Sequence, residues 1–271
     1  LDKGKASPVL QAIQKKVQRG ALMAGTSAGM AIQTKQFVIA NGSSLMALTN
    51  GARAAAWNIS EGELVYEDGV CAGCDQLFYN RFKGVGNFTY GIADTHFSEN
   101  ERTLRLLRLL ADSKQRFGFG VDTYTSLNVE NGMMTVIGQD GVTILDLHQA
   151  KVDQQSEYFG IKNVRISYIR QGDSYNADRD QFRLGGSSIE EIETAELINP
   201  DIMDEMEAGG FQMASLLSQL AQSSREIALG YSLSNDPAYR ITLTKDDRSR
   251  TAILNGKVSV VHIEMKVETI R

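Results

Sequence analysis

Residues 21–33 read Ala-Leu-Met-Ala-Gly-Thr-Ser-Ala-Gly-Met-Ala-Ile-Gln, and they indicate the fold of the whole chain. The apolar run at 21–24 predicts a buried strand, and the small residues after the turn predict a helix. Between them, Gly25-Thr26-Ser27-Ala28-Gly29 has the G-x-S-x-G spacing of a nucleophile elbow. Small neighbours suit a strained turn that exposes the Ser27 hydroxyl and leaves the Ala28 N–H at a helix start. For this pattern alone, an ordinary glycine-rich turn is the alternative.

The composition limits the class of protein. The chain has 271 residues, 42% of them hydrophobic and 23% charged, which predicts a globular fold of one large or two ordinary domains. The net charge is −5 and no run of lysine and arginine occurs, which argues against nucleic acid binding. No stretch has the length of a membrane-spanning helix. These features do not choose between a cytoplasmic and a secreted protein.

The two cysteines, Cys71 and Cys74, form one C-x-x-C in a predicted loop. A zinc site usually needs a second pair of ligands, and no histidine pair lies near at ligand spacing. A thioredoxin-like redox site would need a helix start at this place. We therefore expect two loop thiols or a local disulfide, with no metal and no organic cofactor.

A helix is predicted at residues 7–19, with Ser7 as its N-cap and Pro8 in the first turn. Helix, strand, sharp turn and helix in succession are typical of a parallel α/β sheet. Such a sheet cannot be built from one strand, and the later sequence is of a different type. We therefore expect the N-terminal strands of this sheet to precede Leu1.

The second informative stretch is residues 91–111. A brief strand ends at Asp94, His96 follows it, and Ser98 with Glu101 predicts a capping box at the start of a helix. His148 and His262 lie after or within other strands, so His96 is the histidine placed at the edge of a parallel sheet, where α/β sites form. If Ser27 is a nucleophile, His96 is the best base. Arg102 lies in the first turns of the helix, where the dipole disfavours a cation, which favours a ligand-binding role.

The remaining sequence predicts a β meander and then an α+β extension. A buried strand ends at Asp122, and Asn131-Gly132 predicts a hairpin between residues 126–130 and 133–137. Beyond residue 150 we expect short acidic helices at 188–196 and 200–207 and a longer helix at 211–228. Strands are expected at 239–244, 251–254 and 258–267, with Asn255-Gly256 as the turn between the last two. This extension carries no catalytic motif. Packing, dimer contact or covering of the site are its expected roles.

In this order, the motifs resemble those of the cyanophycinase-type serine peptidases, a group that also holds the aspartyl dipeptidases. The resemblance covers about residues 7–170. It rests on the elbow at Ser27, on Asp94-Thr95-His96-Phe97 with the following arginines, and on Gly120-Val121-Asp122. It implies a three-layer α/β sandwich with a flavodoxin-like or class I glutamine-amidotransferase-like sheet at residues 1–170, followed by a small α+β extension at residues 171–271.

The resemblance also implies roles for single residues. Ser27 corresponds to the nucleophile and His96 to the general base. The substrate-binding positions correspond to Arg102, Arg105, Thr95 and Asn100. The family cuts peptide bonds next to aspartyl residues, and cyanophycinases release β-aspartyl-arginine from a polymer. The implied partner is therefore a peptide with aspartyl and arginyl groups, and a homodimer is expected.

Three positions depart from the family pattern. The family has glutamine before the histidine, where this chain has Thr95, and arginine at the position of Asn100. Its acidic triad member follows the glycine-isoleucine-aspartate block, where this chain has Thr123. A threonine hydroxyl can accept the imidazole N–H but carries no charge.

Two interpretations follow from these departures. In the first, the protein is a working serine hydrolase with the acid supplied elsewhere. Asp122 is a candidate if a twist or bulge turns it from the opposite face of its strand. In the second, the protein has weak or lost catalysis and binds peptides or serves assembly. The presence of both Ser27 and His96 favours the first interpretation.

Overall fold

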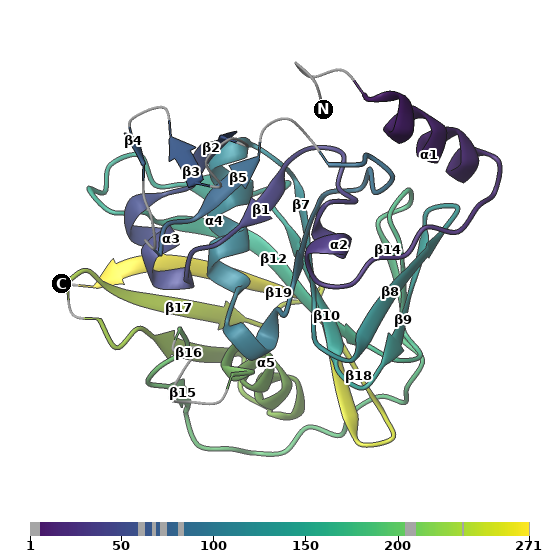
Figure 1. Ribbon diagram of the computed structural model, residues 1–271. Helices are drawn as coiled ribbons and strands as arrows, with labels where there is room; N and C mark the ends of the chain where they lie inside the picture. The colour runs from purple at the N-terminus through teal and green to yellow at the C-terminus, as the bar shows by residue number, and fades with distance from the viewer. Residues whose placement is uncertain are drawn as a thin grey trace.

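The structure, a computed structural model, describes residues 6–58, 63–66, 69–70, 75–80, 84–203, 210–234 and 236–270. Within these residues, the largest sheet has ten strands, and it runs through the middle of the molecule (Figure 1). Eight of its strands follow one another in the order β15 (Leu197–Asn199), β16 (Ile227–Tyr231), β17 (Ala238–Thr244), β19 (Lys257–Ile270), β12 (Ile161–Arg170), β10 (Gly141–Asp146), β7 (Phe117–Val121) and β6 (Ile92–Thr95). Two short strands complete it: β11 (Lys151–Val152) on β12, and β18 (Arg250–Leu254) on β19.

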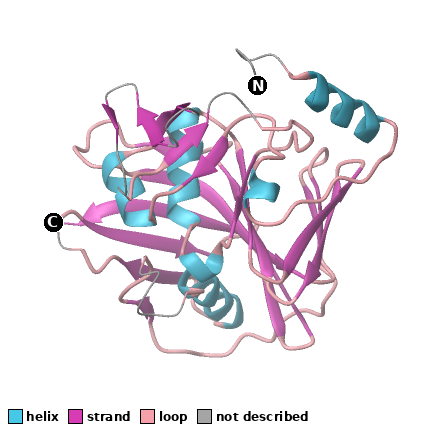
Figure 2. Ribbon diagram, in the orientation of Figure 1, coloured by secondary structure: helices cyan, strands magenta, loops and turns pink. Residues whose placement is uncertain are grey.

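Two smaller sheets and the helices surround this sheet (Figure 2). One small sheet has the order β1 (Val38–Ala40), β5 (Phe78–Asn80), β2 (Arg53–Asn58), β3 (Glu63–Tyr66) and β4 (Gly69–Val70). The other has the order β14 (Gln181–Arg183), β13 (Ser174–Asn176), β9 (Met133–Gly138) and β8 (Thr125–Glu130). The helices are α1 (Pro8–Gln18), α2 (Ala28–Ala31), α3 (Ser44–Asn50), α4 (Thr103–Ser113) and α5 (Gln212–Gln222), with a 3₁₀ turn η1 (Ser98–Asn100).

The large sheet is buried on both faces, as strand β7 shows. Its two glycines approach the helical side, where a Cβ on Gly118 would touch Leu106 and Leu110 of α4 and one on Gly120 would touch the Phe97 ring. Phe119, between these glycines, belongs to a second core against the four-stranded sheet. Successive residues of a strand point to opposite faces, so the chain forms helical, sheet and sheet layers. The predicted three-layer α/β sandwich is confirmed.

The strand directions differ from a purely parallel sheet. Strands β6 and β7 are parallel, as are β15 and β16, whereas the other pairs of the ten-stranded sheet are antiparallel. Within this sheet, the tight turn between β18 and β19 requires an antiparallel pair, because such a turn cannot join parallel strands. The hairpins predicted at Asn131-Gly132 and Asn255-Gly256 are both present. The parallel pair β6–β7 is the part of the sheet that carries the candidate site.

The sheet and its core cross the expected domain boundary at residue 170. Strand β12, which ends there, pairs with β19 of the C-terminal segment. The core cluster on the helical side includes Leu107 of α4, Leu217 of α5 and Ile263 of β19. The residues before and after the boundary therefore share one sheet and one core.

Two predicted elements are absent, and the helix predicted at 211–228 ends early, because α5 spans Gln212–Gln222 and Ile227–Tyr231 forms β16. Residues 21–24 form no strand, and Leu22 is 88% exposed. In the part of the chain that the structure describes, no strand lies beside them to take their backbone hydrogen bonds, which a strand requires. Residues 188–196 form no helix, because the backbone of Ser187 pairs with Ile253 and that of Ile192 with Ser223.

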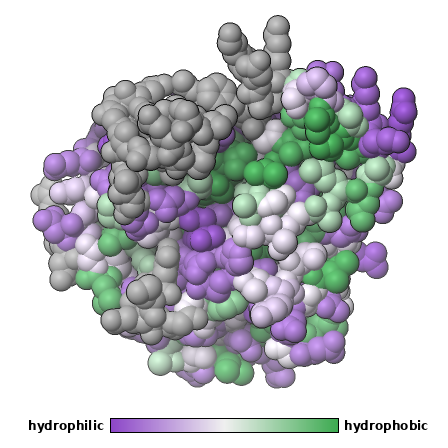
Figure 3. All heavy atoms as spheres, in the orientation of Figure 1, coloured by the Kyte–Doolittle hydropathy of each residue, from purple (hydrophilic) through white to green (hydrophobic). Residues whose placement is uncertain are grey.

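Helix α1 forms as predicted, and the Ser7 hydroxyl caps it by accepting the Leu10 N–H. Its apolar stripe is not covered: Val9 is 69% exposed and Ile13 is 41% exposed. Figure 3 shows apolar side chains gathered over this helix and the segment that follows it.

Cys71, Cys74 and residues 204–207, half of the predicted helix at 200–207, lie outside the described residues. Among the helices described, none is both long and apolar enough to cross a membrane.

Candidate active site

Ser27 lies at the turn that leads into α2. Its backbone has φ 52° and ψ −126°, a combination that lies outside the left-handed helical region and outside every region that L residues favour. Strained conformations of this kind concentrate at functional sites. Gly25 permits the turn, because a Cβ there would lie 2.1 Å from the carbonyl oxygen of Gly29. The Ser27 side chain is exposed, and among the described residues the Ala28 N–H has no hydrogen-bond partner. The turn therefore presents a hydroxyl and a backbone donor together, although no strand precedes it.

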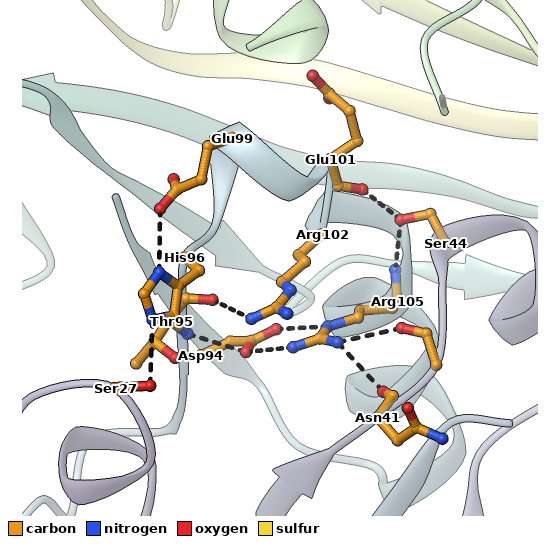
Figure 4. A network of polar contacts seen from close by, with 11 residues as sticks. Ser27, Asn41, Ser44, Asp94, Thr95, His96, Glu99, Glu101, Arg102 and Arg105 are labelled. Carbon is orange, nitrogen blue, oxygen red and sulfur yellow. Dashed lines mark hydrogen bonds and ion pairs between the residues drawn. The ribbon is translucent and has the colours of Figure 1, made fainter. Parts of the chain in front are cut away.

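His96 follows the end of β6 and faces Ser27. Its backbone has φ 48°, so the chain turns sharply after the strand. The His96 Nε2 atom lies 3.1 Å from the Ser27 Oγ atom, which is hydrogen-bond distance (Figure 4). The other ring nitrogen, Nδ1, faces away from Ser27, toward Thr123 and Glu99. This is the arrangement that a nucleophile and its general base require.

Two oxygens approach the Nδ1 atom of His96. The Thr123 Oγ1 atom lies 3.3 Å away, and the Glu99 Oε1 atom lies 3.4 Å away. Glu99 also accepts the backbone N–H of Thr123 at 3.0 Å. Sequence reasoning missed Glu99. Its signal was the position three residues after His96, which lets a side chain on a tight turn fold back onto the imidazole.

Asp122, a predicted candidate for the acid, faces another way. Its buried carboxylate accepts the Ser98 N–H at 2.9 Å, the Gly141 N–H at 3.1 Å and the Tyr168 hydroxyl at 2.7 Å. Burial raises the pKa of this carboxyl, and the three donors oppose that rise. The carboxylate fixes the backbone beside His96 but does not bond to the imidazole.

Arg105, expected to bind substrate, is buried under the site. Its guanidinium donates to both carboxylate oxygens of Asp94, at 2.9 and 2.7 Å. It also donates to the carbonyls of Asn41 and Gly42. Only 6% of the Arg105 side chain is exposed, so this arginine ties β6 to α4 and to the loop after β1. A substrate-binding role for it has no support in this arrangement.

Arg102, Thr95 and Asn100 lie close to His96. The guanidinium of Arg102 is half-buried and donates to the Thr95 carbonyl at 2.6 Å. The Thr95 N–H donates to Asp94, so the backbone of Thr95 is held on both sides. Asn100 ends the η1 turn and is half-buried. Thr95 adjoins His96, and Arg102 is held to the Thr95 carbonyl beside it.

The predicted capping box at Ser98 and Glu101 does not form. The chain makes the η1 turn first, and α4 begins at Thr103 without a side-chain cap. Glu101 instead caps α5, because its carboxylate accepts the backbone N–H groups of Gln212 and Met213. The Glu101 carboxylate therefore bonds to a helix that is distant in the sequence and not to the start of its own helix, as local spacing had predicted.

The C-terminal half of the chain thus supports the loop that carries His96. The Phe211 N–H donates to the Ser98 carbonyl at 2.7 Å. Gly210 has φ 75°, and a Cβ there would lie 2.3 Å from the Glu99 carbonyl oxygen. The η1 turn is therefore fixed by segment 210–213 on one side and by Asp122 on the other.

The other histidines lie elsewhere. His262 is on β19, where its ring meets Phe182 edge-on, and burial lowers its pKa. His148 follows β10. In the described ranges, no group of three or more histidine, cysteine, aspartate or glutamate residues could hold a metal ion.

Comparison with known proteins finds similarity to cyanophycinases. No protein-family model matches the chain. A cyanophycinase from Geminocystis herdmanii is 27% identical over 187 residues, which are 66% of this chain and 58% of that protein. A cyanophycinase from Trichormus variabilis is 25% identical over 177 residues, 63% of this chain and 50% of that protein. This chain is cyanophycinase-like.

A third relative matches a shorter part of the cyanophycinase-like chain. A cyanophycinase from Synechococcus elongatus is 30% identical over 107 residues, 37% of this chain and 33% of that protein. The cyanophycinase-like chain spans about half the length of the curated relatives that it matches. This similarity supports a likeness to the cyanophycinases, and the roles of single residues rest on their geometry.

Proposed function

We propose that this cyanophycinase-like chain is a serine-type hydrolase that cleaves aspartyl peptides, with cyanophycin as the first substrate to test. The observation that carries the proposal is the 3.1 Å approach of the His96 Nε2 atom to the Ser27 Oγ atom at a strained, exposed turn. The relatives are named cyanophycinases, which supports a peptide-hydrolase function and this choice of substrate.

The proposed reaction is acyl transfer. The Ser27 oxygen attacks the carbonyl carbon of the scissile amide, while His96 Nε2 takes the hydroxyl proton. The carbonyl oxygen becomes an oxyanion. The backbone N–H of Ala28, the residue after Ser27, is the proposed hydrogen-bond donor to this oxyanion. His96 then gives its proton to the leaving amine as the C–N bond breaks. Water, deprotonated by His96, then attacks the ester carbonyl carbon, the bond to the Ser27 Oγ atom breaks, and His96 returns the proton to Oγ as the acid product leaves.

Arg102 is the proposed cation for a substrate carboxylate. It is half-buried and bonds to the residue that precedes His96. A guanidinium at this depth attracts an anionic group more strongly than one in open water, because the surrounding dielectric is lower. Thr95 and Asn100 would shape the same end of the site. We do not propose that Arg105 binds substrate, because its guanidinium already donates to both carboxylate oxygens of Asp94.

The test is hydrolysis by the purified chain of cyanophycin and of short aspartyl peptides, with products identified by mass. We expect β-aspartyl-arginine from cyanophycin, and no product from Ser27→Ala. If wild type hydrolyses these substrates no faster than Ser27→Ala does, the proposal of a serine-type hydrolase is contradicted. Retained binding of cyanophycin in that case would favour the peptide-binding or assembly alternative. The expected homodimer stays a prediction that the mass of the assembly in solution tests.

A further inference from the structure

The orientation of His96 needs an explanation, because a base that accepts a proton at Nε2 must keep its Nδ1 proton directed at an acceptor. Position 123, two residues after the end of β7, carries a threonine whose hydroxyl lies 3.3 Å from Nδ1. A hydroxyl can hold a neutral imidazole in place, but it cannot neutralise the charge that appears when His96 takes the proton from Ser27.

We propose that Glu99 is the carboxylate that orients His96 and neutralises its charged form during the reaction. This role rests on the proposed function of Ser27 and His96. The Oε1 atom of Glu99 is 3.4 Å from Nδ1, within ion-pair distance. Hydrogen bonds of this kind are often long in a free enzyme and shorten when substrate binds. Figure 4 shows Glu99, His96 and Ser27 in a line, with the imidazole in the middle.

The Glu99 carboxylate is held in place by the chain around it. Its Oε1 atom accepts the Thr123 N–H at 3.0 Å. Behind it, Gly210 packs against the Glu99 carbonyl, and the Ser98 N–H is bound by Asp122. Thr123 therefore supports the carboxylate through its backbone. A group fixed in this way loses little entropy when the imidazolium forms.

The surroundings of Glu99 favour a cationic partner. Its side chain is only 20% exposed, and among the described residues its Oε2 atom is buried without a hydrogen-bond partner. A buried carboxylate is costly unless paired, and an imidazolium next to it supplies the missing charge. Burial and the charge of Asp122 raise the pKa of this carboxyl, whereas its backbone hydrogen bonds and the nearby His96 lower it.

Glu99 takes no proton in this scheme. The proton from Ser27 Oγ moves to His96 Nε2 and then to the leaving amine, while the Nδ1 proton stays on the imidazole and is donated to Glu99. Asp122 contributes only by fixing the turn, since its oxygens are bonded to Ser98, Gly141 and Tyr168.

The test compares Glu99→Gln with Thr123→Val. Glutamine keeps an acceptor for the Thr123 N–H and removes the charge, whereas valine keeps that N–H and removes the hydroxyl. Two rates are measured across pH: hydrolysis of an aspartyl peptide, and covalent modification of Ser27 by a fluorophosphonate, which needs no knowledge of the substrate. Thermal unfolding of both variants shows whether they are folded.

For Glu99→Gln we expect both rates to fall on the order of 10²- to 10⁴-fold, as when a triad loses its carboxylate. The acid limb of the pH–rate profile should also move to lower pH, because an anion beside the base is gone. Thr123→Val should lose less than Glu99→Gln. Equal rates in wild type and Glu99→Gln, or a larger loss in Thr123→Val, would overturn the role of Glu99.

The two proposals fail in different ways. If wild type hydrolyses no aspartyl peptide but Ser27 is modified in a Glu99-dependent manner, the substrate is wrong and the role of Glu99 stands. If wild type hydrolyses the peptide and Glu99→Gln does so equally, the function stands and the role of Glu99 is wrong.

Discussion

Gly25 and Gly29 flank the same turn, yet only at Gly25 would a side chain collide with the backbone. A Cβ on Gly25 would lie 2.1 Å from the Gly29 carbonyl oxygen, whereas a Cβ on Gly29 would meet nothing within 4 Å. We therefore predict that Gly25→Ala displaces the turn and lowers the rate of Ser27 modification by about 10²-fold, as misplacement of a nucleophile by about 1 Å does.

Gly29→Ala is the matched control. It should leave the turn intact and stabilise α2 by up to about 1 kcal/mol, since alanine is the better helix former. Fluorophosphonate labelling and thermal unfolding of the two variants measure both effects. Similar losses in the two variants would show that the turn does not have the described geometry.

The buried pair of Asp94 and Arg105 makes a second prediction. Arg105→Ala leaves the Asp94 carboxylate buried without its cation, which should cost about 3–5 kcal/mol of unfolding free energy. The control is Arg116→Ala, which breaks ion pairs with Asp146 and Asp180. Because the Arg116 side chain is 40% exposed, each of these pairs should contribute no more than about 1 kcal/mol. Urea unfolding measures both. If Arg105→Ala raises the KM for peptide and leaves the unfolding free energy unchanged, Arg105 binds substrate and the prediction is contradicted.

Glu101 links the site loop to the C-terminal half of the chain. Its carboxylate accepts N–H groups at the start of α5, where an anion is favourable, so Glu101→Ala should destabilise the protein by about 1–2 kcal/mol. Hydrogen exchange should become faster at the Gln212 and Met213 amides. Exposed Glu130 on β8 provides the control, and Glu130→Gln should change neither quantity. Unchanged exchange in Glu101→Ala would remove this link.

The carboxyl of Glu99 gives a pH-dependent prediction. Burial raises its pKa above the ordinary value. The folded state therefore keeps a proton that the unfolded chain has lost, and the unfolding free energy falls as pH rises through that window. The window begins at the ordinary glutamate pKa of about 4.3 and ends at the raised folded value.

Glu99→Gln has no such proton. Its stability relative to wild type should increase through this window and stay level above it, while Ser27 becomes less reactive. Urea unfolding of both proteins from pH 4 to pH 8 tests the sign. If the difference in unfolding free energy between wild type and Glu99→Gln does not vary with pH, the Glu99 pKa is the same in the folded and unfolded states, and the prediction is contradicted.

Local signals in the sequence predicted much of the fold. Ser7 and Pro8 predicted the start of α1, and Asn131-Gly132 and Asn255-Gly256 predicted hairpins, because each depends on neighbouring residues alone. The strand expected at 21–24 and the helix expected at 188–196 failed, because both depend on partners distant in the sequence.

The candidate site divides in the same way. Motif spacing identified Ser27 and His96, which the fold brings into contact. Spacing could not show that Arg105 is buried on Asp94, that Glu101 caps a helix more than a hundred residues later, or that Glu99 turns back to His96. Each of these depends on which neighbour a polar side chain reaches after folding.

The central claim is that Ser27 is a nucleophile activated by His96. The most direct measurement is the intact mass of the chain after reaction with a fluorophosphonate, with the modified residue located by peptide mapping. We predict a single adduct on Ser27, none in Ser27→Ala, and much slower modification in His96→Gln. An unmodified chain, or a Ser27 adduct that forms equally fast in His96→Gln, would contradict the account.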